Sequence, residues 1–212
     1  MNKLDMTAMY AAHAALRRDL ELIARTTSRV DDDPRRILRA AAGWTLFKKA
    51  LELHHTAEDE ALWPQMRAAV AGRADALALL DAMEAEHDAI DPLVEAIDAA
   101  VADRDAGPER LGGLTDALAA ALSGHLRHEE AEALPLMQEI VTEPQWQHFG
   151  QVNARLVGPN AAQILPWLLD GADEQVVATM LAPLPEPARL AYKSQWEPAY
   201  AALDRWGAGS TG

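Results

Sequence analysis

Apolar residues recur in alternating steps of four and three along four separate stretches of this sequence. This spacing places them on one face of an α-helix and is typical of helices packed in a bundle. Pro and Gly separate the stretches and predict four helices, over roughly 5–29, 34–71, 74–104 and 108–141. Asp33 and Pro34 suit the N-cap and first position of the second helix, whereas Pro92 and Pro135 are expected to kink or interrupt their helices. Four buried stripes and three short connections predict an all-α, up-down-up-down four-helix bundle.

Composition agrees with a helical fold and excludes several kinds of site. Half of the 212 residues are hydrophobic but only 5% are aromatic, and the strong helix formers Ala and Leu supply much of the apolar content. Cysteine is absent, which rules out disulfides, thiolate chemistry and cysteine-ligated zinc or iron–sulfur sites.

The charge and the N-terminal segment bear on partners and location. A net charge of −14 argues against a nucleic-acid partner, because such proteins cluster Lys and Arg on their surface. The first helical stretch is amphipathic and does not resemble a signal peptide, and no stretch approaches the ~20 apolar residues of a membrane span. We therefore expect a cytoplasmic protein without a membrane partner, and the sequence makes no prediction of its oligomeric state.

The composition of the sequence changes after Pro144. Most of the aromatic residues lie in this last third, including Trp146, Phe149, Trp167, Tyr192, Trp196, Tyr200 and Trp206. We predict a bundle domain over 1–143 and a C-terminal helical extension over 144–212 that packs on it. The extension is expected either to cover an end or flank of the bundle and restrict access to its interior, or simply to extend the core or form a dimer surface.

Six polar residues interrupt the apolar stripes and are the candidate metal ligands: His13, His54, Glu58, His87, His125 and Glu129. Polar side chains are costly to bury without a partner. The spacing His-x-x-x-Glu occurs twice and puts the two side chains on one helix face, with Cβ atoms about 5–6 Å apart. Six such residues on four inward faces therefore predict a metal site.

The two His-x-x-x-Glu segments also belong to an internal repeat. HHTAEDEALWPQM (54–66) aligns without gaps with HLRHEEAEALPLM (125–137), and a single histidine precedes each segment, His13 and His87. Two equivalent helical hairpins would meet around a pseudo-twofold axis. Four imidazoles and two carboxylates arranged in this way suit two metal ions that the carboxylates bridge, and N/O ligands in a bundle favour iron or manganese over zinc.

In this order of motifs the sequence resembles the haemerythrin-like, or HHE cation-binding, family over about residues 1–141. The resemblance implies a non-haem di-iron centre with bridging carboxylates and an oxo or hydroxo bridge. It implies a small ligand such as dioxygen, nitric oxide or peroxide. The oxygen-carrying members have a second histidine where this chain has Asp91, and an aspartate five residues after the last histidine, where this chain has Glu130. Fewer imidazoles would leave open metal positions, which favours redox reactivity or sensing over oxygen carriage.

Other residues and other functions stay open. Tyr10, His55, His128 and Asp91 are expected beside the ligands, with His55 and His128 as neighbours or solvent-facing residues, although His128 could replace or supplement His125. No catalytic residue other than the ligands is predicted. One alternative is a ferritin-like carboxylate oxidase, for which Glu84-x-x-His87 and Glu52-x-x-His55 fit loosely. Another is a regulatory module in which iron binding orders the bundle.

Overall fold

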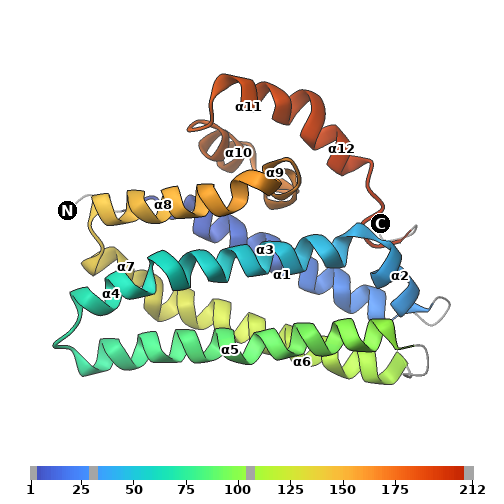
Figure 1. Cartoon of the computed structure of the whole chain (residues 1–212), viewed down its shortest axis with the longest axis horizontal. Helices are drawn as coiled ribbons and strands as arrows, with labels where there is room; N and C mark the ends of the chain where they lie inside the picture. The colour runs from blue at the N-terminus through green and yellow to red at the C-terminus, as the bar shows by residue number, and fades with distance from the viewer. Residues whose placement is uncertain (1–3, 29–32, 104–107, 208–212) are drawn as a thin grey trace.

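Four long helices form the body of the molecule in the computed structural model, which describes residues 4–28, 33–103 and 108–207. They are α1 (Thr7–Thr27), α3 (Ala42–Ala61), α5 (Ala74–Ala102) and α6 (Pro108–His128). α5 and α6 lie side by side, and α1 and α3 pack on them (Figure 1). All regular structure in the described ranges is helical. The predicted all-α bundle is confirmed.

The predicted helix over 34–71 is three helices rather than one. α2 (Pro34–Ala40) begins as expected, because the Asp33 side chain accepts a hydrogen bond from the Arg35 amide. At Ala41 the backbone becomes extended before α3 begins. The carbonyls of Asp204 and Arg205 then accept hydrogen bonds from the amides of Ala42 and Gly43, at 2.9 and 2.8 Å. The break is therefore completed by a segment about 160 residues later in the sequence, which satisfies amides that a helix start leaves free.

Two of the three prolines that lie within the helices predicted for the bundle, Pro64, Pro92 and Pro135, interrupt a helix. α4 (Trp63–Ala69) starts after a break at Leu62, two residues before Pro64. Before Pro135, a π-helical turn, η1 (Glu129–Ala133), separates α6 from α7 (Leu134–Ile140). Proline has no amide hydrogen to continue the helical ladder, and a π-turn is a common way to absorb such a defect. α5, in contrast, runs through Pro92 without interruption.

The predicted apolar stripes face the interior. Nearly all of their residues are buried, including Leu16, Phe47, Ile90, Leu118 and Leu122. Val94 and Leu114 are half-buried and pack against the same core. The polar residues of the stripes lie between two apolar layers, one towards α2 and the other around Trp63, Met66 and Met137.

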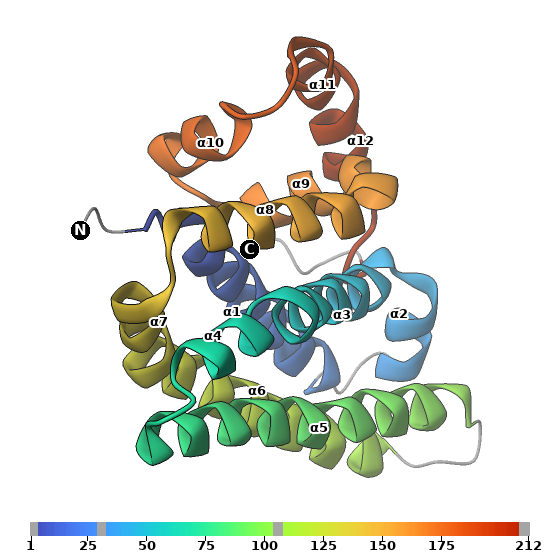
Figure 2. The same ribbon diagram turned by 60° about the vertical axis from the view of Figure 1, so that its left-hand side comes forward.

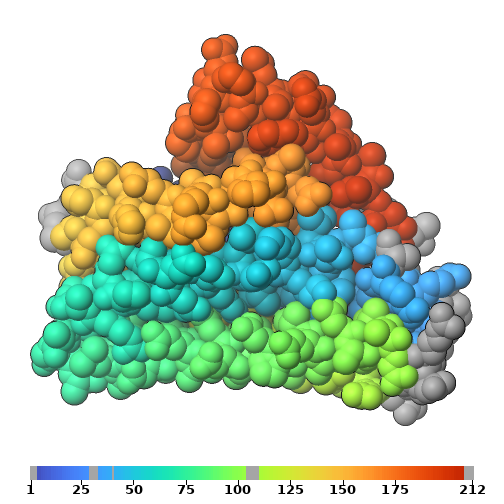
Figure 3. Space-filling view, in the orientation of Figure 1, coloured from blue at the N-terminus to red at the C-terminus, as the bar shows by residue number. Residues whose placement is uncertain are grey.

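The C-terminal extension packs along the flank of the bundle formed by α1 and α3 (Figures 1 and 2). It comprises α8 (Glu143–Val157), η2 (Gly158–Asn160), α9 (Ala161–Leu169), α10 (Glu174–Leu181), α11 (Glu186–Ala191), η3 (Tyr192–Trp196) and α12 (Glu197–Ala201). α8 lies along α3, and α9 contacts both α1 and α3. The last helices rise away from the bundle as a projection (Figure 3) around a small apolar cluster of their own.

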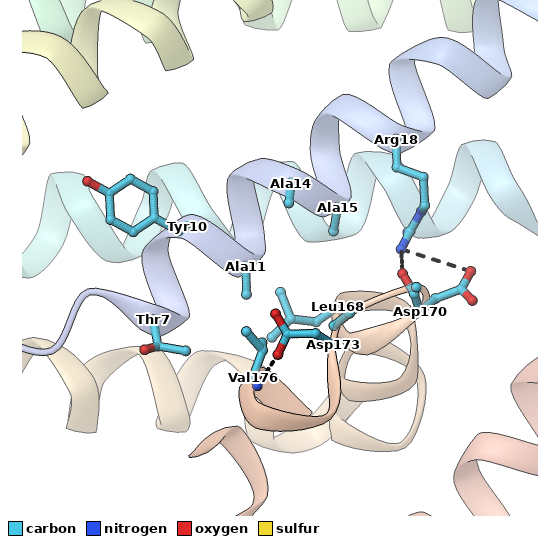
Figure 4. A pocket seen from close by; sticks show the side chains of 12 residues that line it. Thr7, Tyr10, Ala11, Ala14, Ala15, Arg18, Leu168, Asp170, Asp173 and Val176 are labelled. Carbon is cyan, nitrogen blue, oxygen red and sulfur yellow. Dashed lines mark hydrogen bonds and ion pairs between the residues drawn. The ribbon is translucent and has the colours of Figure 1, made fainter. Parts of the chain in front are cut away.

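Polar contacts attach the extension to α1. Arg18 donates a hydrogen bond to the carbonyl of Trp167 at 3.0 Å and another to the carbonyl of Asp170 at 2.7 Å, the second of which is drawn in Figure 4. The indole N–H of Trp167 donates to the buried carboxylate of Asp19 at 2.7 Å. Burial raises the pKa of Asp19, and the neighbouring Arg18 and Trp167 partly offset this effect. α9 is therefore held in one position on α1 by both apolar and hydrogen-bonded contacts.

None of the helices in the described ranges is both long enough and apolar enough to cross a membrane.

Candidate metal centre

The structure brings all six predicted ligands together in the middle of the bundle. They come from α1, α3, α5, α6 and the π-turn η1: His13, His54, Glu58, His87, His125 and Glu129. All are buried except His54, which is partly exposed. Because each His-x-x-x-Glu pair shares one helix face, its imidazole and carboxylate reach the same interior space.

One group of possible ligand atoms belongs to His13, His54, Glu58 and Glu129. These atoms lie within 4.8 Å of one another. Nε2 of His13 is 3.0 Å from Oε2 of Glu129, and Nε2 of His54 is 3.4 Å from Oε1 of Glu58. Two imidazoles and two carboxylates could therefore coordinate one cation here.

A second group of three imidazoles lies beside the first: His55, His87 and His125. Their ligand nitrogens also lie within 4.8 Å of one another. The second oxygen of Glu58 is 3.6 Å from Nε2 of His87, and Oε2 of Glu129 is 3.9 Å from Nε2 of His125. The two carboxylates therefore lie between the groups, as residues that bridge two cations would.

His55 does not face solvent, which was one of the two positions expected for it. Its side chain is buried, with 5% exposed, and its ring stacks on His87 at a centroid distance of 3.8 Å. Adjacent residues of a helix point about 100° apart, so the apolar stripe that contains His54 does not include His55. The pattern of that stripe therefore did not predict that His55 faces the interior. The site therefore holds five imidazoles rather than four, and α3 supplies the one that is missing at Asp91 on α5. The expectation of fewer imidazoles at the metals therefore depends on whether His55 binds one of them.

Three of the imidazoles are oriented by carboxylates. The sequence pattern did not assign this role to them. Nδ1 of His13 bonds Glu130 at 2.8 Å, and Nδ1 of His87 bonds Asp59 at 3.0 Å. These two carboxylates occupy equivalent positions in the internal repeat, which was the signal available in the sequence. Glu86 uses one oxygen for Nδ1 of His125, at 2.9 Å, and the other for Nδ1 of His128, at 2.7 Å.

Arg17 forms an ion pair with Glu130, the carboxylate that bonds His13. Its guanidinium donates two hydrogen bonds to Glu130, at 2.8 and 2.9 Å. The bond to His13 and then the Arg17 fork, partly opposed by burial, lower the pKa of Glu130 to about 2. Burial lowers the pKa of His13, but the carboxylates of Glu129 and Glu130 outweigh burial and raise it.

Burial makes the interior of the site unfavourable for charge. It lowers the pKa values of His54 and His55 well below their usual range. It also raises the pKa of Glu58 well above its usual range, and the nearby charge of Glu129 adds to this effect. Both carboxylates are fully buried, and negative charges placed so close together repel each other.

The unpartnered polar atoms show that the site suits a metal. Within the two ligand groups, these buried atoms have no hydrogen-bond partner among the described residues: Nε2 of His13, His54 and His55, and both oxygens of Glu58 and of Glu129. Unpaired buried polar groups are rare in folded proteins, and a cluster of them calls for a specific explanation. All are lone-pair donors that converge on one space, so cations would satisfy them together.

The remaining candidates lie outside the ligand groups. Tyr10 is 50% exposed and lines surface pockets, and Asp91 is exposed. His128 reaches the site only through Glu86, as a neighbour of the ligands. The glutamates of the ferritin-like motif are exposed, where Glu52 pairs with Lys49 and Glu84 with Arg67. That motif is therefore not assembled around the ligands.

Two pockets lie between the bundle and the extension. The larger, of about 690 Å³, is lined by α1 residues such as Tyr10 and Arg18 and by the α9–α10 connection (Figure 4). None of the ligands lines it. The smaller, of about 80 Å³, has His54 in its wall. Only the smaller pocket touches the candidate metal centre.

Comparison with known proteins gives one match. The family model described as Hemerythrin HHE cation binding domain matches residues 5–137, which is more than half of the chain. No curated protein and no solved structure matches. The matched range includes every candidate ligand and ends before the C-terminal extension.

Proposed function

The chain belongs to the haemerythrin HHE cation-binding family, and we propose that it is a non-haem di-iron protein that binds or reacts with dioxygen, hydrogen peroxide or nitric oxide. The observation that carries this proposal is the convergence of unpartnered imidazole nitrogens and carboxylate oxygens in the buried centre of the bundle. Two separate groups of ligand atoms support two ions rather than one.

The proposed division of ligands follows the two groups. His13 and His54 would hold one ion, and His55, His87 and His125 the other. Glu58 and Glu129 would serve both, because each has oxygen atoms near both groups. An all-N/O set with bridging carboxylates in a helical bundle is typical of iron or manganese, whereas structural zinc prefers four tetrahedral ligands.

Iron bound here would supply Lewis acidity and electrons to a small oxidant. The protein's own part is to orient ligands and control access. Hydrogen bonds from Nδ1 of His13, His87 and His125 to carboxylates fix the ring orientation and leave Nε2 free as the donor atom. The apolar layers on either side keep bulk water from the centre.

The number of imidazoles no longer separates reactivity from oxygen carriage, because His55 provides the fifth. We still propose redox reactivity or sensing, and the reaction of the iron-loaded protein with peroxide tests the choice. Rapid peroxide consumption would support reactivity, whereas stable and reversible oxygen binding without turnover would support carriage.

Metal analysis with an optical spectrum of the aerobically purified protein tests the centre itself. We expect about two irons per chain and charge-transfer bands of ferric iron, as in other bundle di-iron sites. His54→Ala and His125→Ala should each lower the iron content well below that of the wild type. The exposed His148 provides the matched control, so His148→Ala should retain full iron. Full iron in both ligand variants would overturn the assignment.

A further inference from the structure

The two halves of the site differ at one pair of equivalent positions. In the pseudo-twofold arrangement, His54 corresponds to His125 and His13 to His87. The residue before His87 is Glu86, whose carboxylate is hydrogen-bonded to Nδ1 of His125. The residue before His13 is Ala12, which cannot do the same for His54. The ring of His54 therefore lacks the carboxylate partner that its counterpart has.

A pocket lies where that carboxylate is missing. Both Ala12 and His54 line it, and its volume is about 80 Å³. Its other lining residues are almost entirely apolar, with Asn153 the main polar exception. The pocket therefore leads along an apolar wall to one of the proposed metal ligands.

The C-terminal extension forms the outer wall of this pocket. Phe149 and Asn153 come from α8, Trp167 from α9 and Met180 from α10. Phe149 and Trp167 are buried, whereas Asn153 and Met180 are half-buried, which places the opening between α8 and α10.

One wall of the pocket is fixed in place. Trp167 donates its indole N–H to Asp19, and the guanidinium of Arg18 lies over its ring at 5.5 Å. Asp19 and Arg18 belong to α1, the helix that also carries Ala12 and His13. This wall of the pocket is therefore held against the bundle by a hydrogen bond and a cation–π contact.

We propose that this pocket is the route by which small uncharged molecules reach the His54 side of the metal centre, and that the extension sets their size. The inference rests on the proposed function. A cavity of about 150 Å³ holds benzene or xenon, so one of about 80 Å³ holds a diatomic molecule but excludes an organic hydroperoxide. The apolar lining also disfavours ions, because the walls provide few partners for a charge. The ligand class is therefore a diatomic such as nitric oxide or dioxygen.

The first test uses xenon, which binds apolar cavities irrespective of any metal. Wild-type protein under xenon pressure should show one bound xenon beside Ala12 and Trp167, by crystallography or xenon NMR. Ala12→Leu fills the pocket and should abolish this binding. Ala14→Leu makes the same change at an exposed position of the same helix and should leave it intact. An absence of xenon from the wild-type pocket would overturn the proposal.

The second test measures nitric oxide association with the iron-loaded, reduced protein by stopped flow. Ala12→Leu should slow association about tenfold or more at unchanged iron content, since a blocked route lowers the association rate. Ala14→Leu should match the wild type. Equal rates in all three proteins would overturn the access pocket while leaving the di-iron proposal intact. A chain that binds no iron would overturn the proposed function, and its metal analysis would show this directly.

A change at the opening provides a second variant in case Ala12→Leu does not fold. Met180→Ala should widen the opening and speed the reaction with tert-butyl hydroperoxide while leaving nitric oxide association unchanged. Val176→Ala, on the same short helix but lining the larger pocket, is the control. If Met180→Ala leaves the hydroperoxide rate at the wild-type value, the extension does not set the size limit.

Discussion

The Nε2 atoms of His87 and His125 lie 3.1 Å apart inside the bundle, although each ring already bonds a carboxylate through its other nitrogen. Asp59 bonds Nδ1 of His87, and Glu86 bonds Nδ1 of His125. A neutral imidazole has one N–H, and the carboxylates favour it on Nδ1. Both Nε2 atoms then point lone pairs at the same place. A cation between the two Nε2 atoms would relieve this repulsion, which is what the proposed metal site requires of the pair.

His55 provides the sharpest test of the three-imidazole group. We expect His55→Ala to lower iron from about two towards about one per chain, because the other group keeps its own imidazoles and both carboxylates. Inductively coupled plasma mass spectrometry measures the change, with His148→Ala as the exposed control. Unaltered iron content in His55→Ala would show that this residue is only a neighbour of the centre.

Removing the metal should destabilise the fold. A ligand that binds only the native state stabilises it, by about 2.7 kcal/mol at a concentration of 100 Kd. Without a cation, Glu58 and Glu129 stay buried close together without hydrogen-bond partners. The chelated protein should therefore melt several degrees below the iron-loaded protein in calorimetry. Coincident melting curves would contradict metal binding at these carboxylates.

Glu58→Gln should restore part of the stability that the protein loses when its metal is chelated. Burial raises the pKa of Glu58 in the native state above its usual 4.5. The native protein then holds a proton that the unfolded chain releases, so stability falls as pH rises above about 4.5. In urea denaturation, the free energy of unfolding of metal-free Glu58→Gln should exceed that of the metal-free wild type by an amount that grows as pH rises above this value. A stability difference that is flat with pH would argue against a buried, unpaired Glu58.

Glu130 should have the opposite dependence on pH. Its pKa falls from 4.5 to about 2 because of His13 and Arg17, so it stabilises the native state above pH 4.5 and loses this effect as pH falls towards 2. We expect Glu130→Gln to cost about 1–3 kcal/mol at neutral pH, and this cost should disappear as pH falls through about 2. Acid and urea titrations of the metal-free protein measure this. Glu132→Gln, in the same π-turn but largely exposed, should cost little at any pH.

Gly43 makes a close contact that links the start of α3 to the C-terminal segment. A Cβ at this position would lie 2.2 Å from the Arg205 carbonyl oxygen and 2.4 Å from the Trp206 ring. Gly43→Ala should therefore displace the C-terminal segment and cost about 1–3 kcal/mol in thermal or urea unfolding. Gly113→Ala, at an exposed position of α6 with open space around it, should instead stabilise by up to about 1 kcal/mol. Equal effects of the two changes would show that the Gly43 contact does not matter.

The local pattern of the sequence was enough to predict the bundle and most of its site. The 4–3 spacing of apolar residues and the repeated His-x-x-x-Glu segments act within single helices, where residue spacing alone decides which side chains share a face. For this reason the four main helices, and six polar residues that the structure brings together, could be named without knowledge of their contacts.

Tertiary structure decided what depends on residues distant in the sequence. The break at Ala41 is completed by carbonyls of Asp204 and Arg205, which no local pattern reveals. His55 enters the centre because α5 brings His87 against its ring, although its own helix phase does not match the apolar stripe. The pocket beside Ala12 exists only because α8, α9 and α10 cover that flank of the bundle. Helix phase is a property of neighbouring residues, whereas a ligand set and a pocket depend on how whole helices pack together.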